Sequence, residues 1–257
     1  MLEHPLPQEV IEAFQLMFEH FPEGAQLTHK SKQIAALNPA CKAIGRDVGM
    51  ICAKHGPPEA HKGCLANKAL KDRKTTWATS PKRIPDGQTP VAFWIPVDGY
   101  PDFYLHFGLG HRKNYAFPPE QVEASDLSLQ EEYIMQEGPR LPDHVIAAFH
   151  LMWDNFPENA TLVHKSRQVL AVNKAAEKTG ICLPGTNCAR IGSQPHQGCL
   201  ADKALAAGEA RYVHIPLPDG EAVVFWIPLA GRSEYFLHFS IGLSMNYKTG
   251  TPREYER

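Results

Sequence analysis

The residues best suited to chemistry in this chain of 257 residues are cysteines and histidines that recur in two sets. In each set one cysteine lies in a loop, and a histidine and a second cysteine follow, three residues apart, at the start of a predicted helix. Residues i and i+3 of a helix share one side, so two thiolates and an imidazole can converge. Those are three of the four ligands of a tetrahedral zinc site. The predicted metal ligands are Cys52, His61 and Cys64 in the first set and Cys188, His196 and Cys199 in the second.

The spacing does not fix a fourth ligand for either set. A water molecule, a sensed ligand or a histidine present in both copies could fill that position. Because the spacing is not a standard zinc-finger signature, two further interpretations stay open. The cysteines could be small buried residues beside histidines that cap a helix, or the two cysteines of each set could form a disulfide on oxidation. The histidines present in both copies are His29 with His164 and His106 with His238.

These histidines and two tryptophans are the other candidate ligand-binding residues. His106 and His238 occupy strands of alternating character and face away from the predicted core. We expect them on the sheet surface, under an N-terminal helix or in a dimer contact, with ligand binding as the alternative. His29 and His164 lie in His-Lys-Ser turns, where we expect a solvated turn. The residues that either pack on the sheet or form a cavity wall are Trp94 and Trp226.

The chain consists of two copies of one unit. The stretch "LPQEVIEAFQLMFEHFPEGAQLTHKSKQIAALNPA" (6–40) aligns with "LPDHVIAAFHLMWDNFPENATLVHKSRQVLAVNKA" (141–175), and "FWIP" occurs in both copies. Such self-similarity predicts two similar folding units. The predicted boundaries are 1–115 for the first unit, 116–140 for a connector that opens with prolines and is rich in acids, and 141–257 for the second unit with its C-terminal tail.

Hydrophobic periodicity predicts the same order of elements in both units. Apolar residues at i, i+3, i+4 and i+7 predict an N-terminal amphipathic helix over 7–20 and 142–155. Two short strands, small helices, a longer helix over 61–74 and three strands follow. This order predicts an α+β fold of two domains, each a five-stranded antiparallel sheet with helices packed on one face. Strands 1 and 2 should not neighbour strand 3, because the helical segment separates them.

Each unit resembles a PAS domain. The resemblance rests on "GAQLTHKSKQIAALNPACKAIG" (24–45), with its strand–turn–strand–Asn–helix progression, and on the helix before a long hairpin that ends in "FWIPVDGYPDFYLHFGLG" (93–110). It implies a sensory and dimerising module that binds haem, flavin, a small acid, a metal or no ligand. The chain lacks the flavin-reactive cysteine motif of the light-sensing branch.

The predicted cofactor is zinc or another transition metal, and haem is the alternative that the resemblance implies. Haem-binding PAS domains use a histidine on the long helix as the axial ligand, and His61 and His196 lie on the matching helix. Lys68 and Lys203 on the same helices are polar for a porphyrin pocket, which favours the metal ion over haem.

Composition excludes several classes of partner. The net charge is −2 and the isoelectric point about 6.7, which predicts no nucleic-acid partner. No apolar run approaches the roughly 18 residues of a membrane span, and the N-terminus does not read as a signal peptide. We therefore expect a cytoplasmic protein without a membrane partner. In that compartment its six cysteines are thiols or metal ligands.

No catalytic signature is present: we find no G-x-S-x-G elbow, no phosphate-binding glycine loop and no H-E-x-x-H. The expectation is a non-enzymatic sensory module that responds to a metal or small molecule and acts through a signalling protein or a homodimer. A thiol-based redox sensor is the competing hypothesis. An enzyme of unrecognised type comes third, because a fold alone never excludes chemistry.

Overall fold

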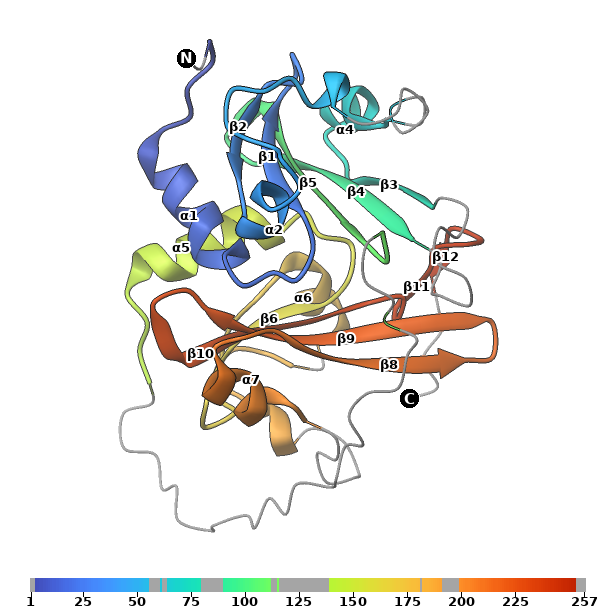
Figure 1. The fold of residues 1–257 in the computed structure, drawn as a ribbon. Coiled ribbons are helices and arrows are strands. Elements are labelled where there is room, and N and C mark those ends of the chain that lie inside the picture. The colour runs from blue at the N-terminus through green and yellow to red at the C-terminus, as the bar shows by residue number, and fades with distance from the viewer. Residues whose placement is uncertain are drawn as a thin grey trace.

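The computed structural model describes residues 3–55, 61, 64–79, 90–111, 115, 139–180, 182–190 and 199–252. Figure 1 shows two units with the same order of elements, one above the other. None of the helices in these ranges has the length and apolar character that a transmembrane span requires.

Unit 1 contains α1 (Gln8–Phe18), β1 (Ala25–His29), β2 (Ile34–Leu37), α2 (Pro39–Lys42), the 3-10 helix η1 (Cys52–Lys54), α4 (Ala66–Asp72), β3 (Thr76–Thr79), β4 (Val91–Val97) and β5 (Tyr100–Leu109). Unit 2 contains α5 (Asp143–Trp153), β6 (Ala160–His164), β7 (Val169–Val172), α6 (Lys174–Thr179), the 3-10 helix η2 (Cys188–Arg190), α7 (Ala201–Ala207), β8 (Arg211–Leu217), β9 (Gly220–Leu229), β10 (Arg232–Ile241), β11 (Met245–Asn246) and β12 (Thr251–Pro252).

Each unit forms one five-stranded antiparallel sheet, with the order β2-β1-β5-β4-β3 in unit 1 and β7-β6-β10-β9-β8 in unit 2. The first strand pairs with the last, so that Leu27 faces Leu105 in unit 1 and Leu162 faces Leu237 in unit 2. The third strand therefore lies at the opposite edge from the first two. This separation and the identical topology of the two halves confirm what the sequence predicts.

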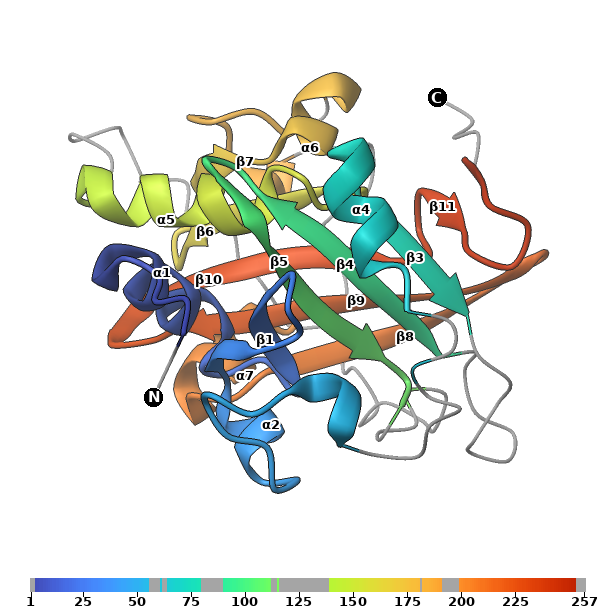
Figure 2. The ribbon, with the colours of Figure 1, turned by 90° about the horizontal axis from the view of Figure 1, so that it is seen from above.

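The two sheets pack back to back, with α4 and α7 on the outside. In Figure 1, α4 lies over the outer face of the upper sheet and α7 over that of the lower sheet, whereas α1 and α5 lie between the units. Figure 2 shows α1 beside α5 and the strands of one sheet crossing those of the other. Phe14 and Met17 of α1 belong to the same hydrophobic core as Phe149 and Met152 of α5. The central core is thus shared by both units. The expectation that all helices pack on one face of each sheet is wrong, because α1 and α5 cover the core face and α4 and α7 the other face.

Contacts between the units are reciprocal. Phe18 stacks on Trp153, which is its own counterpart in the repeat, with ring centroids 5.3 Å apart. Two further contacts form a matched pair, Phe21 with Phe239 at 6.2 Å and Phe107 with Phe156 at 6.0 Å. An interface in which equivalent residues exchange roles is that of a twofold dimer. The single chain is therefore folded as an internal dimer of its two units.

Each unit also places the tyrosine that follows its last long strand, here called the terminal tyrosine, on the sheet of the other unit. The ring of Tyr115, from unit 1, lies 5.5 Å from that of Phe225 in unit 2. The ring of Tyr247, from unit 2, lies 5.3 Å from that of Phe93 in unit 1. Both contacts are edge-to-face, the favoured geometry for aromatic pairs. The face of each sheet is therefore partly covered by a tyrosine of the other unit.

A buried asparagine ties the N-terminal helix of each unit to its sheet. The Oδ1 atom of Asn38 accepts hydrogen bonds from the backbone N–H groups of Ala25 and Cys41, and its Nδ2 donates to backbone carbonyls at the end of α1 and in the turn after it. Asn173 makes the counterpart bonds in unit 2. The same side chain therefore caps α2 or α6 and fixes the turn that leads into the first strand.

A buried glutamate closes the end of the last strand in each unit. Glu23 accepts a hydrogen bond from the N–H of Gly110 at 2.7 Å, and Glu158 accepts one from the N–H of Gly242 at 2.6 Å. Gly242 has φ +89°, and a Cβ there would lie 2.3 Å from a backbone oxygen. Glycine is required at this position because the turn and the close approach both exclude a side chain.

Candidate functional site

The cysteines lie on the outer side of each sheet, in what we call the helix-facing layer, the residues between the sheet and α4 or α7. Cys64 packs there in unit 1, and Cys188 and Cys199 pack there in unit 2. The N–H of Cys52 donates to the carbonyl of the β1–β2 turn at 2.8 Å, and the N–H of Cys188 makes the same bond to the β6–β7 turn at 2.9 Å. The two loop cysteines thus hold equivalent places.

Within each set the two thiols are near enough to interact electrostatically. A charge on Cys64 acts on Cys52, and charges on Cys182 and Cys199 act on Cys188. Burial raises the pKa of the Cys52 thiol and raises that of Cys188 to about 12. Since the thiolate is the form that reacts with oxidants, neutral thiols of this kind are slow to oxidise. The environment of these cysteines therefore disfavours the redox-sensor interpretation.

The expectation that His61 and Cys64 share the first turn of the long helix is wrong, because His61 is helical but lies ahead of α4 and Cys64 is not in a helix. Helix α4 begins at Ala66, and Cys64 precedes it. The N–H of Cys64 donates to the carbonyl of His61 at 3.2 Å, and Nε2 of His61 contacts the carbonyl oxygen of His55 at 2.8 Å. The imidazole is thus engaged with the backbone, and it is not on the long helix as the haem interpretation requires.

The second cysteine of unit 2 holds the same place as that of unit 1. Cys199 precedes α7, which begins at Ala201, just as Cys64 precedes α4. His196 lies outside the described residues. In the described part of the chain, no group of three or more His, Cys, Asp or Glu side chains is arranged to hold a metal ion.

Unit 1 buries a polar network in its helix-facing layer. Gln26 and Thr28, on β1, are 1% and 0% exposed. Nε2 of Gln26 donates to Oγ1 of Thr28 at 2.9 Å, and its Oε1 accepts from Nη1 of Arg46 at 2.8 Å. The hydroxyl of Tyr104 lies in hydrogen-bond contact with Cys52 and Thr28. Buried polar groups cost stability unless they are paired, so this set of mutual hydrogen bonds is a specific feature of unit 1.

Unit 2 has apolar side chains at two of the equivalent places and keeps a polar one at the third, where buried Thr161 replaces Gln26 and donates to the backbone carbonyl of His238 at 3.2 Å. Val163 occupies the position of Thr28, and Phe236 that of Tyr104. Both are buried in one apolar cluster, against which Cys182 packs. The two helix-facing layers therefore differ in chemistry although the backbones around them are alike.

The strand histidines lie in these layers, stacked on the tryptophans. The rings of His106 and Trp94 are 4.9 Å apart, and those of His238 and Trp226 are 5.0 Å apart. Nδ1 of each histidine lies 2.7–2.8 Å from a backbone carbonyl of the neighbouring strand. A carbonyl only accepts, so Nδ1 carries the proton. Burial lowers the pKa of His106 to about 4. The expected place under the N-terminal helix is wrong, because that helix covers the other face.

The turn histidines lie apart from the cysteines. Nδ1 of His29 accepts the N–H of Ser31 and lies 2.8 Å from its hydroxyl, and His164 makes the same contacts with Ser166. The ring of His29 packs 5.0 Å from that of Phe103, and the residue is only 4% exposed. The expectation of a solvated turn is therefore wrong for His29. Both histidines close the His-Lys-Ser turn.

A long cationic side chain crosses the edge of each helix-facing layer. Lys32 donates to Oδ1 of Asn67 on α4 at 2.6 Å and passes over the ring of Tyr104. In unit 2 the equivalent contacts join Arg167 to Asp202 on α7 at 2.6 Å and to the ring of Phe236. Each contact links the first hairpin to the outer helix, and so holds the helix over the layer.

Sequence reasoning missed the polar network because its members do not form a motif. Gln26 and Thr28 alternate along a strand, and Arg46 and Tyr104 come from distant parts of the chain. The available signal was the comparison of the two copies at strand positions. In the alignment of the two copies, Thr28 corresponds to Val163 and Tyr104 to Phe236, while the apolar residues that alternate with them are apolar in both copies.

No protein-family model matches the chain, and no curated protein sequence matches it. Among solved structures, the E. coli DhaR(N)–DhaL complex is 12% identical, with 91% of this chain and 86% of that chain covered and a TM-score of 0.28. The sensor region of a sensor histidine kinase is 14% identical, with 91% and 92% covered and a TM-score of 0.27. An extracellular ligand binding receptor from Desulfohalobium retbaense DSM5692 is 11% identical, with a TM-score of 0.22. The match covers 85% of this chain but only 30% of the receptor chain. At these values we draw no inference from the similarities.

Proposed function

We propose that this chain is a sensory module in which unit 1 binds a small polar molecule in its helix-facing layer, while unit 2 serves as its structural partner. The observation that carries the proposal is the difference between the two layers. Unit 1 has Thr28 and Tyr104 where unit 2 has Val163 and Phe236 in an apolar cluster, and the longer amide Gln26 where unit 2 has Thr161. Buried polar groups stabilise a fold less than apolar packing does. Recognition of a polar ligand would account for their presence in unit 1.

The charge of the layer favours a ligand that carries an anionic group. Arg46 reaches Gln26 and acts electrostatically on Cys52 and His106. No carboxylate lies within ion-pair distance of Arg46 in the described part of the chain. A guanidinium binds carboxylate or phosphate oxygens through two parallel hydrogen bonds. The neutral imidazole of His106 adds an acceptor for a ligand hydroxyl or amine.

Strand alternation gives the proposed site a route to the rest of the molecule. Gln26 and Thr28 face the helix-facing layer, while Leu27 between them belongs to the core that both units share. A displacement of β1 by the ligand therefore acts on the interface with unit 2. In this proposal the output is a change at that interface, read by a signalling protein or by a second copy of the chain.

The test is a thermal-shift screen of the full chain with the twenty L-amino acids and with acetate, lactate, succinate and malate, followed by calorimetric titration. We expect one class to bind with 1:1 stoichiometry. The double variant Thr28→Val with Tyr104→Phe introduces the unit 2 residues, which the fold accepts, and should weaken binding at least tenfold. Phe236→Tyr is the control in unit 2 and should leave binding unchanged. Unaltered affinity in the double variant would contradict the proposal.

A transition-metal ion on Cys52, His61 and Cys64 is a second proposal, supported by the proximity of the two thiols. Binding would require both thiols to lose their protons, and His61 to turn away from the carbonyl of His55. The test is elemental analysis of protein purified without added metal, followed by zinc titration at pH 6 and 8. We expect tighter binding at pH 8 and its loss in Cys52→Ser and Cys64→Ser. An equal affinity in these variants would exclude the site.

A further inference from the structure

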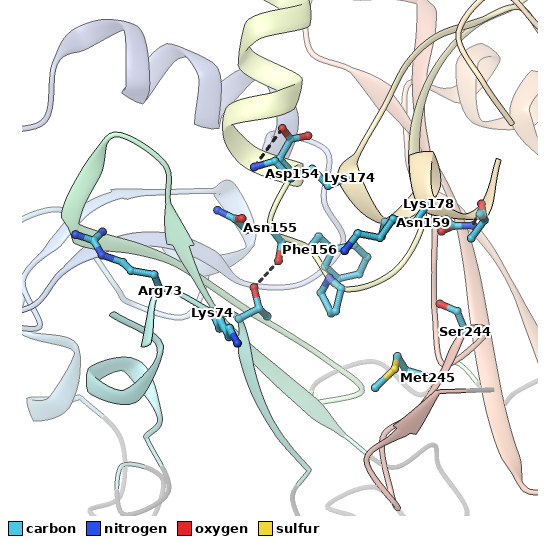
Figure 3. Close-up of a pocket in the computed structure, with 14 residues that line it drawn as sticks. Arg73, Lys74, Asp154, Asn155, Phe156, Asn159, Lys174, Lys178, Ser244 and Met245 are labelled. Carbon is cyan, nitrogen blue, oxygen red and sulfur yellow. Dashed lines mark hydrogen bonds and ion pairs between the residues drawn. The ribbon is translucent and has the colours of Figure 1, made fainter. Parts of the chain in front are cut away.

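A cavity of about 450 Å³ lies between the two units, on the side of the sheets away from the helix-facing layers. Its wall in unit 1 is the segment after α4, and its wall in unit 2 is formed by the α5–β6 loop, by α6 and by the turn after β10 (Figure 3). This volume is in the range of small-molecule sites. The residues that carry the argument are Lys74 and Thr75 of unit 1 and Asp154, Asn155, Lys174 and Lys178 of unit 2.

The cavity carries an excess of positive charge. Lys174 is compensated, since its Nζ lies 3.0 Å from Asp98 and 3.8 Å from Asp154. Lys74 and Lys178 have no carboxylate within ion-pair distance among the residues that the structure describes. Figure 3 shows Lys178 reaching from α6 toward the middle of the lining residues, with Lys74 on the opposite wall. Two uncompensated ammonium groups therefore face the same space from different units.

The repeat allows the lysines of the cavity to be compared with their counterparts, because the backbone around them is alike in both units. Lys74 follows the end of α4 and its N–H bonds the carbonyl of Ala69, just as the N–H of Glu209 bonds that of Ala204 after α7. Helices α2 and α6 both begin after the capping asparagine. The counterparts of Lys74, Lys174 and Lys178 are Glu209, Pro39 and Ala43. The fold therefore does not require lysine at these three positions.

The walls of the cavity are held together by hydrogen bonds between the units. The hydroxyl of Thr75 donates to the carbonyl of Asn155. The side-chain amide of Asn155 donates to the carbonyl of Pro96 at 3.0 Å and to Asp98 at 2.8 Å. A molecule bound here would contact both units at their seam, and its binding would depend on their relative position.

We propose that this cavity binds a small polyanion, a molecule with two or more phosphate or carboxylate groups, which bridges Lys74 of unit 1 and Lys178 of unit 2. The site is separate from the helix-facing layer and does not depend on the proposed function. Two like charges on opposite walls repel, so a bridging anion removes a repulsion across the seam as well as gaining two charge-assisted hydrogen bonds. The polyanion would thereby stabilise one relative position of the units.

The experiment is calorimetric titration of the full chain with pyrophosphate and, separately, with citrate, at constant ionic strength. We expect saturable 1:1 binding of at least one probe, and the probe that binds more tightly tells whether phosphate or carboxylate is preferred. Lys74→Gln and Lys178→Gln should each weaken binding at least tenfold, and the double variant should abolish it. Lys74 and Lys178 are exposed, so these variants should fold. Lys42→Gln removes an exposed charge outside the cavity and should bind as the unmodified chain does.

Two outcomes would overturn the proposal. The first is the absence of saturable binding for both probes. The second is binding that persists in the double variant; if that binding is lost in Arg46→Gln, the anion binds in the helix-facing layer of unit 1 instead.

Discussion

Replacing His106 by asparagine should remove part of the acid-dependent loss of stability of this protein. The imidazole stacks on Trp94, and Nδ1 donates to the carbonyl of Phe93 at 2.7 Å. Asparagine places an amide donor near the same carbonyl, so the hydrogen bond can persist while the titrating group is gone. At pH 7 the variant should lose about 1–2 kcal/mol, mainly through the lost ring contact.

The magnitude follows from the pKa of His106, which burial lowers from the ordinary value of 6.5 to about 4. Above pH 6.5 the ring is neutral in both the folded and the unfolded chain, and the full stability is present. As the pH falls from 6.5 to 4, the unfolded chain takes up a proton that the folded chain does not, which favours unfolding. The free energy lost over this window is about 3 kcal/mol, at about 1.4 kcal/mol for each unit of pKa difference.

The assay is urea unfolding of the unmodified chain and of His106→Asn at pH values from 4 to 7.5. Burial also lowers the pKa of His29 and of His164, and these contributions remain in both proteins, so the difference between them isolates His106. The difference in the free energy of unfolding should shrink, and then reverse in sign, as the pH approaches 4. Parallel curves over the whole range would refute the reasoning.

Three further changes test the fold. Trp153→Ala should lower the free energy of unfolding by about 3–5 kcal/mol in a single calorimetric transition, because the ring lies in the shared core; two separate transitions would contradict a shared core. Asn173→Ala should cost about 2–4 kcal/mol in chemical denaturation, since it leaves several buried backbone groups without partners, whereas a cost below 1 kcal/mol would show that water replaces them. Arg73→Gly should raise the free energy of unfolding by about 1 kcal/mol, because Arg73 has φ +52° where its counterpart is Gly208; an unchanged denaturation midpoint would argue against backbone strain there.

Most of the fold could be predicted because local patterns and the repeat point to the same elements. The alternation in "FWIP" and "YLHFGLG" predicts strands, and the Pro-bounded apolar stripe at the N-terminus predicts a helix; the structure has these at β4, β5 and α1. The back-to-back packing could not be predicted. It depends on which face of the sheet Phe18 and its counterpart Trp153 cover, and hydrophobic periodicity shows that a face is buried without showing against what.

The candidate site was predictable to a smaller extent. The recurrence of the cysteines predicts equivalent sites in the two units, and the structure places these cysteines in the two helix-facing layers. The helix start was misplaced because "HKGCLANKAL" has no capping residue before Ala66, and Leu65 takes the cap position without a side-chain bond. The role of Glu23 and Glu158 was invisible, since a carboxylate in a "FPE" turn is normally exposed. Its burial follows from partners about 85 residues away along the chain.

The exchange of terminal tyrosines has a consequence for synthesis of the chain. Strand β4, with Phe93, leaves the ribosome long before Tyr247, which covers it. At about 5–20 residues per second, the delay is on the order of 8–30 s. During this interval unit 1 can form its sheet, but the aromatic face that unit 2 later covers stays exposed to solvent or to chaperones. Chaperone dependence and losses to aggregation should therefore concentrate in the period when only the first copy of the repeat has been made.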